Sequence, residues 1–340
     1  MKRVLFLFIF IGMGFSSFSH KLNNNENIFK INDDNNQISV QLHIGEVEFN
    51  LVDVNNQSFT RIVLDNNYYS NIIGNPELPQ FNRLIEIPFG SNVNVNIIRS
   101  EYIDFNLSEN GYPNQIFPNQ PSLSKSGNPE NITFEMDESV YQTNKFVNDE
   151  IINIVNKGIM RSVQIGNLMV SPFNYNPVTE ILRIYTDIEV KISFDNINAE
   201  LHNSMKSVYY SPYFEPIYKS SIENYNVSNS REDNLIGDKV TYVIVANEIF
   251  RDSMVEFVEW KTKKGFHVIE AYTDEIGSSA SAIKSYLTNL YNSPGIGVAP
   301  PSFVLLVGDT QQLPASYSSG GHVSDLDYCD FTNDNLPEIL

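Results

Sequence analysis

Apolar and polar residues alternate with a period of two along most of the first two thirds of the chain. The alternation is clearest over residues 38–44, 47–51, 93–97 and 188–194. Because successive side chains of a strand point to opposite faces, each of these runs predicts a strand with one buried face. Short alternating strands separated by proline- and glycine-containing turns are typical of antiparallel sandwiches. The pattern therefore predicts a β-sandwich domain over residues 20–230.

Two stretches of this region depart from the alternation. Residues 146–157 have a spacing that favours a short helix. Residues 195–238 are rich in Tyr, Ser, Asn and Pro, and the stretch around Arg231 has the composition of an exposed linker. Loops of small polar residues are preferred sites of proteolysis, so Arg231 is a candidate processing site, with an ordinary surface arginine as the alternative. We place the domain boundary in this stretch.

Longer apolar runs replace the alternation in the last hundred residues. Strands and helices are predicted in turn, and in chain order they are residues 242–246, 250–264, 266–272, 278–292 and 303–307. The first and last strands are continuously apolar, which suits strands buried on both faces. Trp260 lies on the first predicted helix and is expected to be a core residue. Gly265 ends that helix. This order predicts a parallel α/β unit with right-handed crossovers.

Three strands form an incomplete sheet for a domain of this kind. Residues 239–340 are therefore interpreted as the first part of a truncated α/β domain.

The N-terminus has the three parts of a secretory signal peptide. Lys2 and Arg3 precede an apolar stretch over residues 4–15, and Ser17 and Ser19 supply the small residues of a cleavage site. We expect residues 1–19 to be removed and the protein to be secreted or displayed at the cell surface. A buried N-terminal strand is the alternative. No later run reaches the roughly 18 apolar residues that a membrane span needs.

The charge balance excludes two classes of partner. The chain has 41 Asp and Glu residues against 22 Lys and Arg, a net charge of −19. Nucleic acids and anionic membranes bind basic surfaces that displace their counterions, so neither is expected as a partner. A single cysteine among 340 residues excludes an internal disulfide framework.

That cysteine, Cys329, and His322 are the candidates for a catalytic thiolate and its base. They lie only seven positions apart on one loop, and neither follows a buried strand that would fix its position. We therefore expect an ordinary cysteine and a surface histidine.

Acidic residues after the third predicted strand are better candidates for a site. Asp309 lies at the carboxyl end of that strand, where ligands of open α/β sheets gather. Asp334 and Glu338 are four positions apart, with backbone carbonyls between them. Calcium takes six to eight oxygen ligands from carboxylates, carbonyls and water. A solvated acidic loop is the alternative to a calcium site.

Several segments resemble the gingipain family of cysteine peptidases. They are VTYVIVANEIF, VEFVEWKTKKGFHV, SFVLLVGDTQQLPA and SDLDYCDFTNDNLPEI within residues 240–340, and GNPELPQFNRLIEIPFG at residues 74–90. The resemblance implies a signal peptide, a prodomain that covers its own catalytic domain, and the first part of a caspase-like domain. It places the catalytic His and Cys beyond Leu340. In the full-length parent, a Cys thiolate activated by His would attack protein or peptide substrates.

The resemblance also implies ligands for calcium. Asp309, Asp334 and Glu338 would bind through side chains, and Phe331 and Leu336 through main-chain oxygens. The segment is one residue longer than the family pattern, and the alternatives to this set are Asp325, Asp327 and Asp330.

Two other functions remain open at this point. One stays within the fold, a gingipain-like sortase or maturation protease of an outer-membrane secretion system. The other is a non-enzymatic secreted binding or adhesion protein whose sandwich is the working part. A His and then a Cys after strands in the sequence following Leu340 would favour a peptidase over the binding protein. A C-terminal sorting domain would favour the secreted protease, and membrane anchoring would favour the sortase.

Overall fold

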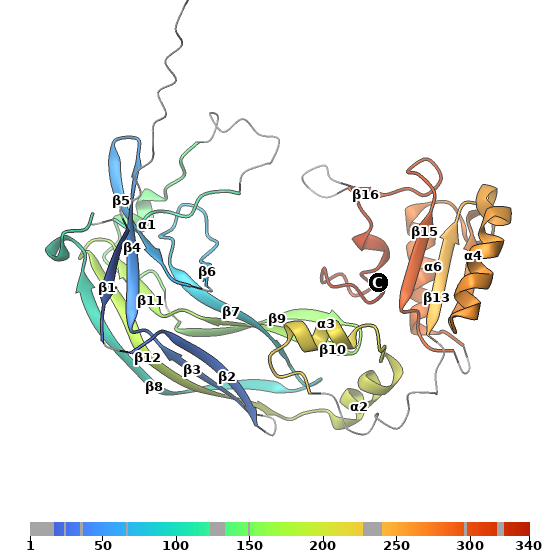
Figure 1. Ribbon diagram of the computed structural model, residues 1–340, viewed down its shortest axis with the longest axis horizontal. Helices are drawn as coiled ribbons and strands as arrows, with labels where there is room; N and C mark the ends of the chain where they lie inside the picture. Colours follow the sequence, from blue (N-terminus) through green and yellow to red (C-terminus); the bar gives the residue numbers. More distant parts are fainter. Residues whose placement is uncertain are drawn as a thin grey trace, which may run out of the picture.

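The computed structural model describes residues 17–340 except for residues 24, 35–36, 66, 114, 123–132, 149, 227–239, 296–297 and 318–322. A large β-rich part and a smaller α/β part make up the molecule (Figure 1). The first sixteen residues, which carry most of the expected signal peptide, lie outside the described residues, as do Arg231 and His322.

Antiparallel strands dominate the N-terminal part. They are β1 (Ser17–Lys21), β2 (Ile28–Asp34), β3 (Gln37–His43), β4 (Glu46–Val54), β5 (Gln57–Val63), β6 (Tyr68–Tyr69), β7 (Pro79–Glu86), β8 (Asn92–Asn106), β9 (Ile152–Met160), β10 (Val163–Val170), β11 (Phe173–Asn176) and β12 (Ile181–Asp195). The helices of this part are η1 (Ser108–Asn110), α1 (Glu138–Tyr141), α2 (Ala199–Val208) and α3 (Glu215–Ser221). The sheets have the orders β1-β4-β5, β6-β7-β10-β9 and β11-β12-β3-β2, and β8 pairs along the length of β12.

One hydrophobic core joins these sheets. Val40 of β3 and Val190 of β12 are fully buried on one sheet, and Ile85 of β7 and Leu168 of β10 are fully buried on another. All four belong to the same cluster of packed side chains. The burial of β3 alternates along the strand, as the period-two pattern predicts. The predicted β-sandwich is confirmed.

The predicted helix at residues 146–157 is wrong. Residues from Ile152 onward form β9, which pairs antiparallel with β10. Ile152 is buried in the sandwich core. Pairing with a strand further along the chain therefore outweighs a weak local helical spacing.

Two helices lie in the stretch after residue 195, where the period-two alternation ends. Helix α2 begins at Asn198, whose side chain accepts a hydrogen bond from the Leu201 amide. Phe214 and Tyr218, before and within α3, pack against Val163 and Ile165 of β10. Both helices lie on the side of the sandwich nearer the α/β part, and α3 lies beside β9 and β10 (Figure 1).

The α/β part has the predicted order of elements. They are β13 (Thr241–Ala246), η4 (Glu248–Phe250), α4 (Arg251–Lys263), β14 (His267–Tyr272), α5 (Thr273–Ile276), α6 (Ala280–Asn292), β15 (Phe303–Val307), β16 (Ser316–Tyr317), β17 (Val323–Ser324) and η5 (Leu326–Tyr328). The three main strands are parallel in the order β14-β13-β15. The parallel α/β unit is therefore confirmed.

The central strand β13 is buried at every position because helices cover both of its faces. Val243 and Val245 pack against the α6 side, and Tyr242 and Ile244 pack against the α4 side. This arrangement explains the continuous apolar run in the sequence. The expectation that Trp260 of α4 is a core residue is wrong, because its side chain is 46% exposed. The ammonium group of Lys264 lies 4.2 Å from the centroid of its ring. Within the described part of the chain, no helix is long and apolar enough to cross a membrane.

Candidate acidic site and the contact between the two parts

An acidic loop, residues 330–338, follows η5 in the α/β part. Its ends are fixed by main-chain hydrogen bonds, from the Glu338 amide to the Cys329 carbonyl at 2.9 Å and from the Leu340 amide to the Ser302 carbonyl at 2.9 Å. Asn333 and Asn335 have left-handed backbone conformations, with φ of 58° and 66°. Asparagine tolerates this conformation better than most residues, so the loop reverses direction sharply between its carboxylates.

Three carboxylates of this loop converge. One oxygen each of Asp330, Asp334 and Glu338 lies within 4.8 Å of the others. Asp330 is 6% exposed and Glu338 is 1% exposed. The three residues are spaced by four positions each, a signal in the sequence that could have identified Asp330 as a member of the group.

Hydrogen bonds orient these carboxylates. Glu338 accepts from the Phe331 amide at 2.7 Å and from the Thr332 hydroxyl at 2.9 Å. The hydroxyl of Thr332 also lies 2.7 Å from Asp334, which accepts from the Leu336 amide at 2.9 Å. Burial and the nearby negative charges of the two aspartates together raise the pKa of Glu338 to about 7.

Three buried or half-buried carboxylates around one point fit a hard cation. Calcium is bound by carboxylate and carbonyl oxygens, and a cation there would offset the mutual repulsion of the charges. The donor set of the acidic loop is therefore chemically suitable for calcium. The structure brings together two of the predicted side-chain ligands, Asp334 and Glu338, and adds Asp330 to them.

The other predicted ligands lie differently. Asp309 is exposed at the carboxyl end of β15, accepts from the Thr310 amide at 2.7 Å, and is not in the group of converging carboxylates. The ring of Phe331 packs against Tyr291 with centroids 5.1 Å apart. Leu336 packs against the cluster that contains Tyr218 of the sandwich part. Asp325 and Asp327 are also outside the converging group.

Cys329 has no feature of an activated nucleophile. Its side chain packs against the core beneath α6. Burial and the negative charges of Asp325 and Glu338 together raise the pKa of the thiol to about 11. A thiol with this pKa is almost entirely protonated near neutral pH, whereas the thiolate is the reactive form.

The predicted signal-peptide cleavage site lies in a strand. Ser19 is in β1, where it pairs with Glu48 of β4. Its hydroxyl donates to the Glu46 carboxylate. Cleavage after Ser19 would leave His20 and Lys21 as the remaining residues of β1.

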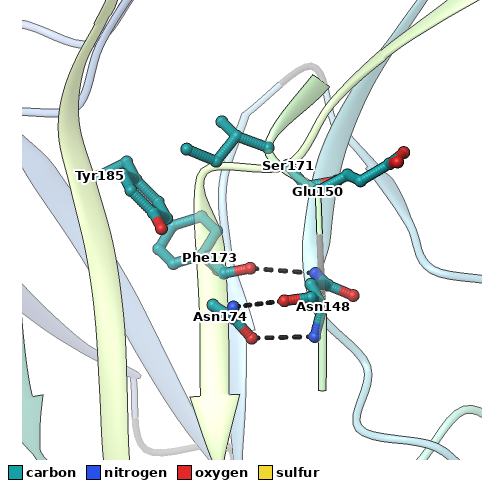
Figure 2. A pocket seen from close by; sticks show the side chains of 7 residues that line it. Asn148, Glu150, Ser171, Phe173, Asn174 and Tyr185 are labelled. Carbon is teal, nitrogen blue, oxygen red and sulfur yellow. Dashed lines mark hydrogen bonds between the residues drawn. The ribbon is translucent and has the colours of Figure 1, made fainter. Parts of the chain in front are cut away.

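A small recess in the sandwich part is lined by Asn148 and Asn174, which are hydrogen-bonded to each other (Figure 2). The main-chain nitrogen of Asn148 donates to Asn174 Oδ1 at 2.9 Å, and its side-chain nitrogen donates to the Phe173 carbonyl at 3.1 Å. Asn174 in turn donates to the Asn148 carbonyl at 2.6 Å. These hydrogen bonds hold the segment that joins α1 to β9 against strand β11.

The two parts of the molecule meet at the turn between β9 and β10. Arg161 in this turn donates to the main-chain carbonyls of Pro300, Pro301 and Glu338. The main-chain amide of Ile159 donates to Asp334 at 2.7 Å. The acidic loop is therefore in direct contact with the sandwich part.

Side chains of the segment that follows β12 widen this contact. The hydroxyl groups of Ser211 and Ser302 are 2.9 Å apart and hydrogen-bonded. Tyr209 stacks on Tyr291 with ring centroids 5.0 Å apart.

A β-sandwich held by buried contacts against the first strands of an α/β domain is the organisation of a propeptide and its enzyme domain. The family comparisons agree with this class. The family model described as Propeptide_C25 matches residues 19–228, and the one described as Peptidase family C25 matches residues 236–340. The chain belongs to the gingipain-like C25 peptidase family, of which it contains the propeptide and part of the peptidase domain.

Relatives of known name agree with this assignment. Lys-gingipain of Porphyromonas gingivalis is 29% identical over 306 residues, which are 89% of this chain and 18% of that protein. Gingipain R2 of the same species is 30% identical over 251 residues, 73% of this chain and 32% of that protein. The chain therefore spans less than a third of the length of either relative.

Solved structures of Porphyromonas gingivalis proteins also match. One, described as structural insight into zymogenic latency of gingipain K, is 27% identical with a TM-score of 0.48 and covers 53% of this chain and 99% of that chain. A complex of RgpB pro- and mature domains is 24% identical with a TM-score of 0.48 and covers 58% of this chain and 98% of that chain.

The first prediction concerns Cys329. Because its thiol has a pKa of about 11, we expect slow alkylation by iodoacetamide at pH 8, at least about tenfold slower than that of a free cysteine peptide. Mass spectrometry over time measures the rate. The same protein should hydrolyse no fluorogenic peptide. Peptide hydrolysis that disappears in Cys329→Ala would show that this cysteine is a nucleophile.

Proposed function

We propose that this chain is the N-terminal portion of a secreted cysteine endopeptidase that is made as an inactive zymogen. The sandwich part acts as the prodomain of this zymogen, and the α/β part begins its catalytic domain. The observation that carries the proposal is the buried contact of the β9–β10 turn with the start of β15 and the acidic loop. The C25 family matches support a peptidase and disfavour the alternative of a non-enzymatic adhesion protein.

In the full-length parent, proteins or peptides would be the substrates, and a Cys–His pair would carry out acyl transfer. The residues in this chain have a different role. They hold the prodomain on the enzyme domain, and the thiol of Cys329 stays protonated and half-buried. Maturation requires that the covalent link between the two parts be cut, and Arg231 is the proposed cleavage site.

We also propose that calcium binds the acidic loop. Asp334 and Glu338 would supply carboxylate oxygens, with Asp330 as an additional ligand from the converging group. The resemblance to gingipains adds Asp309 and the main-chain oxygens of Phe331 and Leu336. Calcium would supply positive charge that stabilises the fold of the loop.

Cleavage at Arg231 tests the prodomain role. Limited trypsin digestion is expected to cut first after Arg231, since the residues around it are small and polar. The two fragments should remain together on size-exclusion chromatography, because the contact between the parts does not need the covalent link. In Arg231→Gln the first cut should move or slow markedly. Separation of the wild-type fragments in native buffer would contradict the prodomain role.

Export is tested by the N-terminus of the secreted protein. The charged, apolar and small-residue segments of residues 2–19 lead us to expect mature protein that begins at His20. Intact-mass spectrometry of extracellular material checks this. A Ser19→Glu variant places a large charged residue at the cleavage position and should accumulate as the uncleaved precursor. Mature extracellular protein that still carries Met1 would disprove the signal peptide.

Calcium binding is tested by thermal unfolding of the whole chain. At a hundredfold excess over Kd, calcium should stabilise the folded form by about 2.7 kcal/mol, seen as a rise in Tm. Asp334→Asn and Glu338→Gln should remove most of the gain, and Asp309→Ala should do so as well because the resemblance makes it a ligand. Asp325→Ala is the matched acidic control and should retain the gain.

Magnesium should stabilise the chain less than calcium does, because it demands a tighter octahedral geometry than mixed carbonyl and carboxylate ligands provide. An equal rise in Tm for wild type and Asp334→Asn would mean that the acidic loop does not bind calcium.

A further inference from the structure

Arg161 is a buried cation in an unusual position. It lies in the two-residue turn between β9 and β10, has a left-handed φ of 55°, and is 1% exposed. Long charged side chains are almost never fully buried unless they are paired. Among the described residues, no carboxylate forms an ion pair with it, and its Nε has no hydrogen-bond partner. Burial accordingly lowers the pKa of its guanidinium.

Main-chain carbonyls of the α/β part take the place of a carboxylate. Nη1 donates to the Pro301 carbonyl at 2.5 Å and to the Glu338 carbonyl at 3.1 Å, and Nη2 donates to the Pro300 carbonyl at 2.9 Å. Residues 300–301 precede β15, whereas Glu338 ends the acidic loop after it. One guanidinium therefore joins the segment before β15 to the end of the acidic loop.

Aromatic rings close the space around the guanidinium. Its central carbon lies 5.4 Å from the ring centroid of Phe214 and 5.6 Å from that of Tyr291. Phe214 belongs to the sandwich part and Tyr291 to α6 of the α/β part. Cation–π attraction and the carbonyl dipoles thus replace the lost hydration. Only a planar fork of donors reaches three carbonyls at once, so a lysine at this position would satisfy fewer of them.

Strand β9, which leads into this turn, makes a second contact with the acidic loop. The Ile159 amide donates to Asp334 Oδ2 at 2.7 Å. The preceding residue, Gly158, has a φ of 128°, and a Cβ atom there would lie 2.1 Å from the same oxygen. Glycine is therefore required both by its backbone conformation and by the close approach of Asp334. Strand β9 and the turn together therefore contact the middle of the acidic loop at Asp334 and its end at Glu338.

We propose that the β9–β10 turn is a clamp that holds the acidic loop in place against the start of β15. Arg161 fixes the end of the loop at Glu338, and the Ile159 amide orients Asp334. The prodomain thereby acts as a positioning element for the structure of the enzyme domain. This inference rests on the proposed prodomain role and deepens it, but it requires neither calcium nor cleavage of the linker.

Hydrogen exchange of the intact chain in EDTA tests the clamp. In Arg161→Ala, the amides of Asn335, Leu336 and Glu338 should exchange about tenfold faster or more, because loss of a buried hydrogen-bonding group loosens the loop locally. The amides of Val243 and Val245 in β13 should exchange at wild-type rates. Alanine is used because glycine would relieve the positive φ and obscure the loss of the guanidinium.

The matched control is Arg183→Ala, which removes a prodomain arginine that pairs with Asp104 on the sandwich sheet at 2.7 and 2.9 Å. Exchange in the acidic loop should be unchanged in this control. Wild-type exchange in Arg161→Ala, or equal acceleration in both variants, would overturn the clamp.

A third variant, Arg161→Lys, tests the clamp if Arg161→Ala does not fold. Arg161→Lys keeps the charge but not the fork, and the acidic loop should then exchange faster than in the wild type. Wild-type exchange in a folded Arg161→Lys protein would overturn the clamp in that case. Separation of the wild-type fragments after linker cleavage would instead refute the prodomain role, so the two failures can be told apart.

Discussion

The buried guanidinium of Arg161 fixes how the two parts of this molecule meet. Taking a charge out of water is costly, and the cost is offset only where the surrounding dipoles have the right geometry. The carbonyls of Pro300, Pro301 and Glu338 provide that geometry in one relative orientation of the parts. Apolar packing alone would tolerate sliding, since dispersion and hydrophobic contacts are non-directional. The polar contact therefore gives the interface its register, and the aromatic rings around it exclude water.

This kind of contact allows the two parts to separate. Each partner group has an alternative in water after separation, because a guanidinium and three main-chain carbonyls are readily hydrated. The interiors of the two parts differ in this respect. The fully buried strand β13 and the single sandwich core bury side chains such as Val243 and Val190 that have no such alternative. Separation of the parts would consequently leave each core intact.

The sequence predicts those elements whose pattern is local. Alternation marks the sandwich strands, and a continuous apolar run marks β13, because side-chain burial follows directly from the strand period. The helix prediction for residues 146–157 was wrong because the pairing of β9 with β10 cannot be read from the spacing of apolar residues in this segment alone. Of the proposed calcium ligands, Asp334 and Glu338 lie together in the structure, and their convergence with Asp330 depends on left-handed turns within the loop. Arg161 has no sequence signature, because its partners are main-chain atoms more than a hundred residues away.

The acidic loop thus receives two of its hydrogen bonds from another part of the chain. Asp334 accepts an N–H donor from Ile159, and the main chain at Glu338 accepts the guanidinium of Arg161. Loss of the prodomain would remove a hydrogen bond from one carboxylate and a cation from the end of the loop. The remaining cluster of Asp330, Asp334 and Glu338 would then depend more on any other positive charge that could bind there. By linkage, a cation that binds more tightly to the separated α/β part would also favour departure of the prodomain. The geometry of one turn therefore connects the contact between the two parts to the charge of the acidic loop.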